Sequence, residues 1–207
     1  WIRSSMPRVR SIHARMVPDK GRREANSARR MEPANKEPQV SRLDGRIVPG
    51  YGPPRARVLA IGERPGEEEA ARMRPFVGKS GKEQRAHLER NGINVDDWYL
   101  DNLCPDYQPG NPAPTPEDVA KWGPRLLETI ERVNPKFIIT AGRHSTQFFH
   151  GESAHLEAVH GVPHRWRGRT VIPIYHPAAH FYQPDLLPFI VWDYQHTVKI
   201  ITGKVGV

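Results

Sequence analysis

The sequence predicts a three-layer α/β/α fold in which a four-stranded parallel sheet lies between two layers of helices. Short apolar runs of strand length alternate along the chain with segments of helical pattern. Such alternation is typical of parallel sheets whose two faces are both covered. The 207 residues provide one domain of this kind, with about fifty residues to spare.

The first half of the predicted domain holds two strands and two helices. Residues 58–61 form an apolar run that ends at a glycine, as a buried parallel strand does. Residues 79–91 have a weak helical pattern with a glycine as its stop, and residues 98–102 form the second strand. Thr115 as N-cap and Pro116 at the first helical position then predict a helix that runs past Ile130 and ends before Pro135.

The second half repeats this order. Residues 136–141 form a third strand closed by a glycine, and residues 143–150 form a short helix. Residues 171–175 are the fourth strand, and Pro173 within it predicts a position at the edge of the sheet, because proline cannot donate to a strand ladder. Residues 185–202 form the last helix, which we expect a proline to interrupt near its start.

Residues 1–50 carry most of the excess positive charge. They hold twelve Lys and Arg against five Asp and Glu, which accounts for +7 of the net charge of +8. Because their apolar residues follow no period, we interpret them as a basic, largely disordered arm that precedes a domain at residues 51–207. Such an arm can hold a phosphate backbone without reading sequence, although a solvated tail without a partner is the alternative.

Composition excludes several classes of protein. No run of eighteen apolar residues occurs, so we expect no membrane-spanning helix and no membrane partner. The single cysteine, Cys104, excludes a disulfide or a four-cysteine metal site within one chain and favours a reducing, cytoplasmic compartment. The ten histidines are scattered, so we predict neither a metal site nor a cofactor.

Glycines and polar residues gather after the predicted strands, where ligands bind in parallel sheets. The segments are GERPG at 62–66, PFVGKSG at 75–81, DN at 101–102, GNPAPTPE at 110–117 and HPAA at 176–179. Together they resemble the uracil-DNA glycosylase superfamily, most of all its family 4, over about residues 56–200. The resemblance implies a monomeric enzyme of base excision repair that hydrolyses the N-glycosidic bond of a flipped uracil in single- or double-stranded DNA.

Two features depart from the family pattern. Family 4 usually binds a four-iron cluster through four cysteines, but two of those positions are Asp106 and Trp122 here, and the N-terminal region has no cysteine. The chain therefore resembles a cluster-free relative, in which we expect Trp122 to pack on apolar surface and Asp106 to find a polar partner. The second departure is Arg64, where a small residue is usual. Its side chain is expected to contact a DNA phosphate, to pair with Glu63, or to block the water site.

The resemblance assigns a uracil pocket to Gly62, Arg64, Phe76 and Asn102. Phe76 is the floor on which the base stacks. Asn102 reads the base edge, because an amide with one acceptor and two donors matches O4 and N3–H of uracil and not the reversed pattern of cytosine. The alternatives are an ordinary core position for Phe76 and a turn at the strand end for Asn102.

The resemblance assigns three catalytic residues, which are Glu63, Asn102 and His176. His176 is expected to stabilise the negative charge that develops on the leaving base. Glu63 is expected to place water or stabilise the sugar cation. The alternatives are a turn histidine before a proline for His176 and a salt bridge to Arg64 or Arg74 for Glu63.

The residues expected to contact DNA flank this pocket. They are Gly78 and Ser80 in the second motif, and His180 and Phe181, with Phe181 as an apolar wedge that fills the space of the flipped base. Simple surface packing is the alternative for Phe181. For the whole chain, the alternatives to an active glycosylase are a catalytically impaired or re-tasked DNA- or base-binding member of the same fold and an unrelated α/β nucleotide enzyme.

Overall fold

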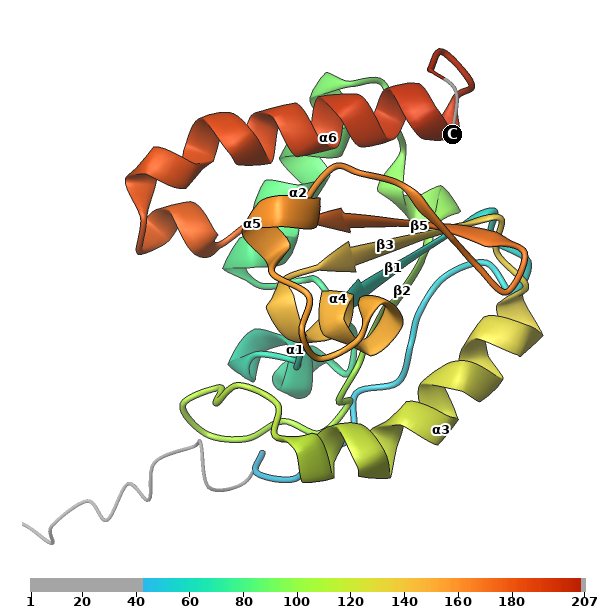
Figure 1. Cartoon of the computed structure of the whole chain (residues 1–207). Helices are drawn as coiled ribbons and strands as arrows, with labels where there is room; N and C mark the ends of the chain where they lie inside the picture. Colours follow the sequence, from blue (N-terminus) through green and yellow to red (C-terminus); the bar gives the residue numbers. More distant parts are fainter. Residues whose placement is uncertain (1–42, 206–207) are drawn as a thin grey trace, which may run out of the picture. The chain divides into compact units, whose positions relative to one another are not determined.

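A computed structural model of the chain describes residues 43–205, which contain one five-stranded sheet flanked by helices (Figure 1). Its strands are β1 (Val58–Gly62), β2 (Tyr99–Asn102), β3 (Phe137–Ala141), β4 (His164–Trp166) and β5 (Arg169–Ile174). They lie in the order β2-β1-β3-β5-β4, and only β4 is antiparallel to its neighbour. The predicted four-stranded parallel sheet is therefore corrected to a five-stranded mixed sheet.

The helices agree with the prediction in their main features. The four predicted ones are α2 (Lys79–Arg90), α3 (Pro116–Val133), α4 (Arg143–His150) and α6 (Leu187–Ile201). Two short helices were not predicted, α1 (Glu67–Arg72) and α5 (Leu156–Val159), and the 3₁₀ turns are η2 (Val95–Asp97), η3 (Ala179–Phe181) and η4 (Pro184–Leu186). The proline expected to interrupt the last helix lies in its first turn, where it is tolerated. None of the helices of the described residues is long and apolar enough to cross a membrane.

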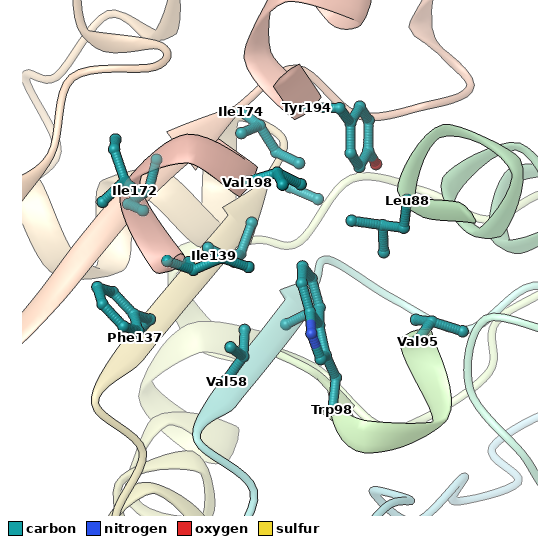
Figure 2. Close-up of a cluster of buried hydrophobic side chains, with 14 of the residues drawn as sticks. Val58, Leu88, Val95, Trp98, Phe137, Ile139, Ile172, Ile174, Tyr194 and Val198 are labelled. Atoms are coloured by element: carbon teal, nitrogen blue, oxygen red, sulfur yellow. The ribbon is translucent and has the colours of Figure 1, made fainter. Parts of the chain in front are cut away.

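Both faces of the sheet are buried. Alternate residues of β1 point to opposite sides, so that Val58 and Ala60 belong to one apolar cluster and Leu59 and Ile61 to the other. The first cluster is completed by α2, α5 and α6, and Figure 2 shows its centre around Ile139. The second is completed by α3 and α4. This two-sided burial explains why the strands read as continuous apolar runs.

The predicted edge position of Pro173 is wrong, because β5 lies between β3 and β4. The proline is accommodated because β4 pairs only with residues 169–171 of β5. The Pro173 carbonyl accepts the N–H of Gly161 at 2.7 Å on that side. Pro173 therefore lies beyond the end of the short β4, where a missing N–H costs no ladder bond.

The folded body begins earlier than the sequence indicated. Residues 43–50 were assigned to the basic arm, but Val48 is 1% exposed and its N–H donates to the Pro105 carbonyl at 2.8 Å. Ile47 forms an antiparallel bridge with Asp106. Tyr51 forms a second antiparallel bridge with Leu100, and these two residues exchange two backbone hydrogen bonds. The rest of the arm, residues 1–42, lies outside the described residues.

Candidate active site

A small cavity lies at the carboxyl ends of β1, β2 and β5. Its volume is about 70 Å³, and it adjoins a groove of about 650 Å³ with which it shares part of its wall. Six residues assigned to the site from the sequence line the cavity, and they come from segments up to more than a hundred residues apart. The cavity is lined by Gly62, Arg64, Pro65, Gly66, Glu69, Phe76, Ser80, Asn102, Asn111 and His176.

The absence of a side chain at Gly62 leaves room in this cavity. A Cβ atom at Gly62 would lie 2.5 Å from Oδ1 of Asn102 and 3.1 Å from Cζ of Phe76. Phe76 itself has a φ of 56°, which is uncommon for a large side chain and marks a constrained position. Gly81 allows this conformation, since a Cβ there would lie 2.0 Å from the Phe76 carbonyl oxygen.

Hydrogen bonds to its backbone groups hold Asn102 in place. Its N–H donates to Oδ1 of Asp101 at 2.8 Å, and its carbonyl accepts from Nη2 of Arg125 at 2.8 Å. Arg125 also forms a two-pronged ion pair with Asp101, at 3.0 and 3.1 Å. Since these contacts use only the backbone, the side-chain amide of Asn102 stays available to the cavity that it lines.

A backbone contact fixes the tautomer of the His176 ring. Its Nδ1 accepts the N–H of Ala178 at 3.3 Å, so the proton of the neutral ring lies on Nε2. Burial lowers the pKa of His176 below its ordinary value of 6.5, although Glu63 and Glu69 oppose the shift. His176 is thus a neutral hydrogen-bond donor at pH 7, on the wall that the cavity and the groove share.

Glu63 lines the groove beside the cavity. Its Oε1 accepts the backbone N–H of His144 at 2.7 Å and lies 3.1 Å from Nδ1 of the same residue. Burial alone would raise the pKa of Glu63, but these hydrogen bonds and the imidazoles of His144 and His176 outweigh it, and the pKa lies below its ordinary value of 4.5. Glu63 is therefore an ionised carboxylate, and the expected salt bridge to Arg64 or Arg74 is replaced by the contact with His144.

Glu69 is a site residue that the sequence analysis missed. Its side chain accepts the N–H groups of Gly66 at 3.1 Å, Val77 at 3.0 Å and Gly78 at 2.6 Å. One buried carboxylate thereby joins the two glycine-containing loops that form the cavity wall. Its place in the first turn of α1, three residues after Gly66, is the usual position of an acid that closes a helix start, and that spacing was the available signal.

The side chain of Arg64 makes contacts that none of the three sequence-based alternatives included. Its side chain is 1% exposed, and its guanidinium pairs with Asp106 at 2.8 Å and with Asp118 at 2.7 Å. The expected pairing with Glu63 is therefore wrong, and the 1% exposure of the side chain speaks against the expected contact with a DNA phosphate. The guanidinium is thereby committed to one carboxylate in the loop after β2 and one in the first turn of α3.

The two positions where family 4 would have cysteines behave as expected. Asp106 finds its polar partner in Arg64, and Trp122 packs against the apolar cluster under α3. The cysteine of the chain, Cys104, is buried nearby, and burial raises the pKa of its thiol to about 12. Within residues 43–205, no three His, Cys, Asp or Glu side chains gather as metal ligands.

The residues predicted to face DNA divide into two groups. Gly78, Ser80 and Phe181 line the groove, and Nζ of Lys79 lies 4.2 Å from the centre of the Phe181 ring. His180 does not line it, because its ring turns back to within 2.8 Å of the Pro177 carbonyl. Tyr182, which was not singled out, lines the groove and is 87% exposed.

Comparisons with known proteins agree with this geometry. Residues 49–198 match the sequence model of the Uracil DNA glycosylase superfamily. The chain is 37% identical over 147 residues to a type-4 uracil-DNA glycosylase of Archaeoglobus fulgidus, covering 67% of this chain and 74% of the relative. It is 34% identical over 167 residues to that of Sulfurisphaera tokodaii, covering 76% of each. A DNA polymerase of Bacillus phage SP01 is 28% identical over 156 residues, which are 75% of this chain and 17% of the polymerase.

Proposed function

The chain belongs to the uracil-DNA glycosylase superfamily, and we propose that it is itself an active uracil-DNA glycosylase of base excision repair. The observation that carries the proposal is one cavity lined by the amide of Asn102, the ring of Phe76 and the imidazole of His176, with the carboxylate of Glu63 in the adjoining groove. Together they supply a ring for stacking, an amide for the base edge and two groups that can act on the charge that develops during cleavage.

Recognition of uracil is assigned to Asn102 and Phe76. The Asn102 amide offers an acceptor to N3–H and a donor to O4 of uracil, whereas cytosine would oppose donor to donor and leave buried groups unpaired. Stacking on the Phe76 ring contributes roughly 1–3 kcal/mol without selecting among bases. Selectivity against cytosine therefore comes from the amide, and room for the base comes from the bare Cα of Gly62.

Catalysis is assigned to His176 and Glu63. The C1′–N1 bond breaks with its electron pair going to the base, and a water oxygen bonds to C1′ of the sugar. The proton that this water loses balances the proton that the uracil anion takes up from solvent, so the products are an abasic sugar and neutral uracil. The Nε2–H of a neutral His176 stabilises the charge that develops on the base, which is worth a few kcal/mol. The ionised Glu63 places the water and stabilises the sugar cation.

DNA is proposed to lie along the groove. Phe181, held against the Lys79 ammonium, and the exposed Tyr182 are the rings available to fill the space of the flipped nucleotide. The re-tasked alternative depended on an arginine side chain in the position of the water. The pairing of Arg64 with Asp106 and Asp118 removes the observation that favoured it.

The proposal is tested with labelled oligonucleotides that carry a single uracil or a cytosine at the same position, followed by alkali cleavage. We expect cleavage at uracil and none at cytosine, whose edge the Asn102 amide does not match. Glu63→Gln and His176→Asn should each lower the single-turnover rate about a hundredfold, because each removes a group that acts on developing charge. A folded parent protein that leaves the uracil strand uncleaved would contradict the proposal.

A further inference from the structure

The first turn of α4 is built around one oxygen of Glu63. Both hydrogen-bonding contacts from His144 converge on Oε1. A Cβ at Gly142 would lie 2.7 Å from the same oxygen, and Gly142 also has a φ of 106°, so a side chain is disfavoured there on both counts. Oε2 is thereby the oxygen that remains for a molecule in the groove.

The proton of the His144 ring is fixed by a second contact. Nη2 of Arg143 lies 3.2 Å from Nε2 of His144. A guanidinium can only donate, so Nε2 accepts, and the proton of the neutral ring must lie on Nδ1. Nδ1 therefore donates to Oε1 of Glu63, and the three side chains form a line that ends at the carboxylate.

His144 reaches the reaction only through Glu63. The His144 ring lines a separate hollow of about 300 Å³, with Pro116 and Phe148 among its neighbours. The groove and the cavity are lined instead by Glu63 and His176. His144 and His176 are also the titratable groups that face the Glu63 carboxylate from other elements.

We propose that His144 is a positioning residue: its ring N–H fixes Oε1 of Glu63 and turns Oε2 toward the reacting sugar and water. The effect on rate rests on the proposed function. The effect of His144 on the Glu63 carboxylate does not depend on that function, so the rate and the carboxylate are tested separately.

The first test measures single-turnover uracil excision by the parent, His144→Ala and His144→Asn across pH. We expect His144→Ala to lower the plateau rate about tenfold, or 1.4 kcal/mol, with DNA affinity unchanged. The hydrogen bond from the His144 ring lowers the pKa of Glu63, so the active, ionised carboxylate persists as the pH falls. Loss of this donor raises the pKa, and the acid limb of the rate profile should therefore move to higher pH. His144→Asn should recover most of the rate, because its amide N–H occupies the position of Nδ1–H.

Two controls separate positioning from a structural tie between β1 and α4. Gln147→Ala alters the same helix one turn later, at a side chain that binds the carbonyls of Glu152 and Ala154, and should leave the rate unchanged. Adding His144→Ala to Glu63→Gln should not lower the single-turnover rate below that of Glu63→Gln alone, because His144 acts on the reaction through Glu63. A lowered Tm with an unchanged rate and acid limb in His144→Ala would overturn the proposal.

The second test needs no DNA. The pKa of the isotope-labelled Glu63 carboxyl, followed by NMR, should rise in His144→Ala and stay near the parent value in Gln147→Ala. An unchanged pKa in His144→Ala contradicts the proposal directly. If the parent releases no uracil, the proposed function fails, and this titration still decides whether His144 controls the carboxylate.

Discussion

Gly62 is the residue whose replacement most directly fills the cavity. A methyl group there would lie 2.5 Å from Oδ1 of Asn102, in the space proposed for the base. We therefore expect Gly62→Ala to abolish uracil excision and to leave DNA binding through the groove within about threefold. The residue lies in a buried strand, so circular dichroism and Tm verify folding. Excision at the parent rate by Gly62→Ala would show that the base binds elsewhere.

The residues brought together at the cavity were predictable where each follows a strand. Asn102 closes β2 and His176 follows β5, and the carboxyl ends of parallel strands share one edge of the sheet. His144 was not predictable, because its contact with Glu63 joins residues 81 apart and depends on how α4 packs. Arg64 was misjudged for the same reason, since its partners lie 42 and 54 residues away.

At the scale of elements, Arg64 ties the end of β1 to the loop after β2 and to α3. Asp118 serves this tie and also caps α3, because it closes a capping box with Thr115, the residue that the sequence predicted as N-cap. Removal of the guanidinium leaves Asp106, which is 7% exposed, without its charged partner. Breaking a buried pair in this way typically costs about 3–5 kcal/mol.

We therefore expect Arg64→Met to lower the free energy of unfolding by about 3 kcal/mol in denaturant titrations. DNA affinity and its salt dependence should not change, since the side chain is 1% exposed. Arg72→Met is the matched control, because its pair with Glu68 is exposed on both sides and should matter by less than about 1 kcal/mol. Equal effects of the two substitutions, or a lower salt dependence in Arg64→Met, would contradict this role.

Elements defined by a long pattern were predictable, and short ones were not. The β4 strand has the sequence HRW and is only partly buried, so it carries neither an apolar run nor an alternation. Its existence follows from pairing with β5 through a tight turn at Arg167 and Gly168, both of which have positive φ. The rule that a proline avoids a paired strand position holds for Pro173. The unpaired position is only the end of β5, beyond the residues that pair with β4, and not a whole edge strand.

At the scale of the whole chain, the charge is concentrated in the segment outside the described residues. Residues 1–42 hold eleven Lys and Arg against four Asp and Glu, so their deletion removes a net charge of +7 of the total of +8. We expect this deletion to weaken DNA binding and flatten the dependence of Kd on salt. Excision from short single strands at low salt should survive, because the truncation keeps residues 43–50, which pack on the body.

The comparison is made by titrating one duplex at several salt concentrations with the full chain and the truncated chain. A salt slope that stays the same would show that the arm does not contact phosphates, in agreement with a solvated tail. Loss of soluble, folded protein would show that residues 1–42 contribute to the fold.

The central claim, that Asn102 lies in a pocket from which uracil is cleaved, is tested most directly by release of free uracil under single-turnover conditions. The parent and Asn102→Ala are compared at equal occupancy of one uracil-containing strand, with the base measured by mass spectrometry. The account predicts one uracil per bound strand from the parent, and release at least about a hundredfold slower from Asn102→Ala, whose Kd for DNA stays similar. No release by the folded parent, or release by Asn102→Ala at the parent rate, would contradict it.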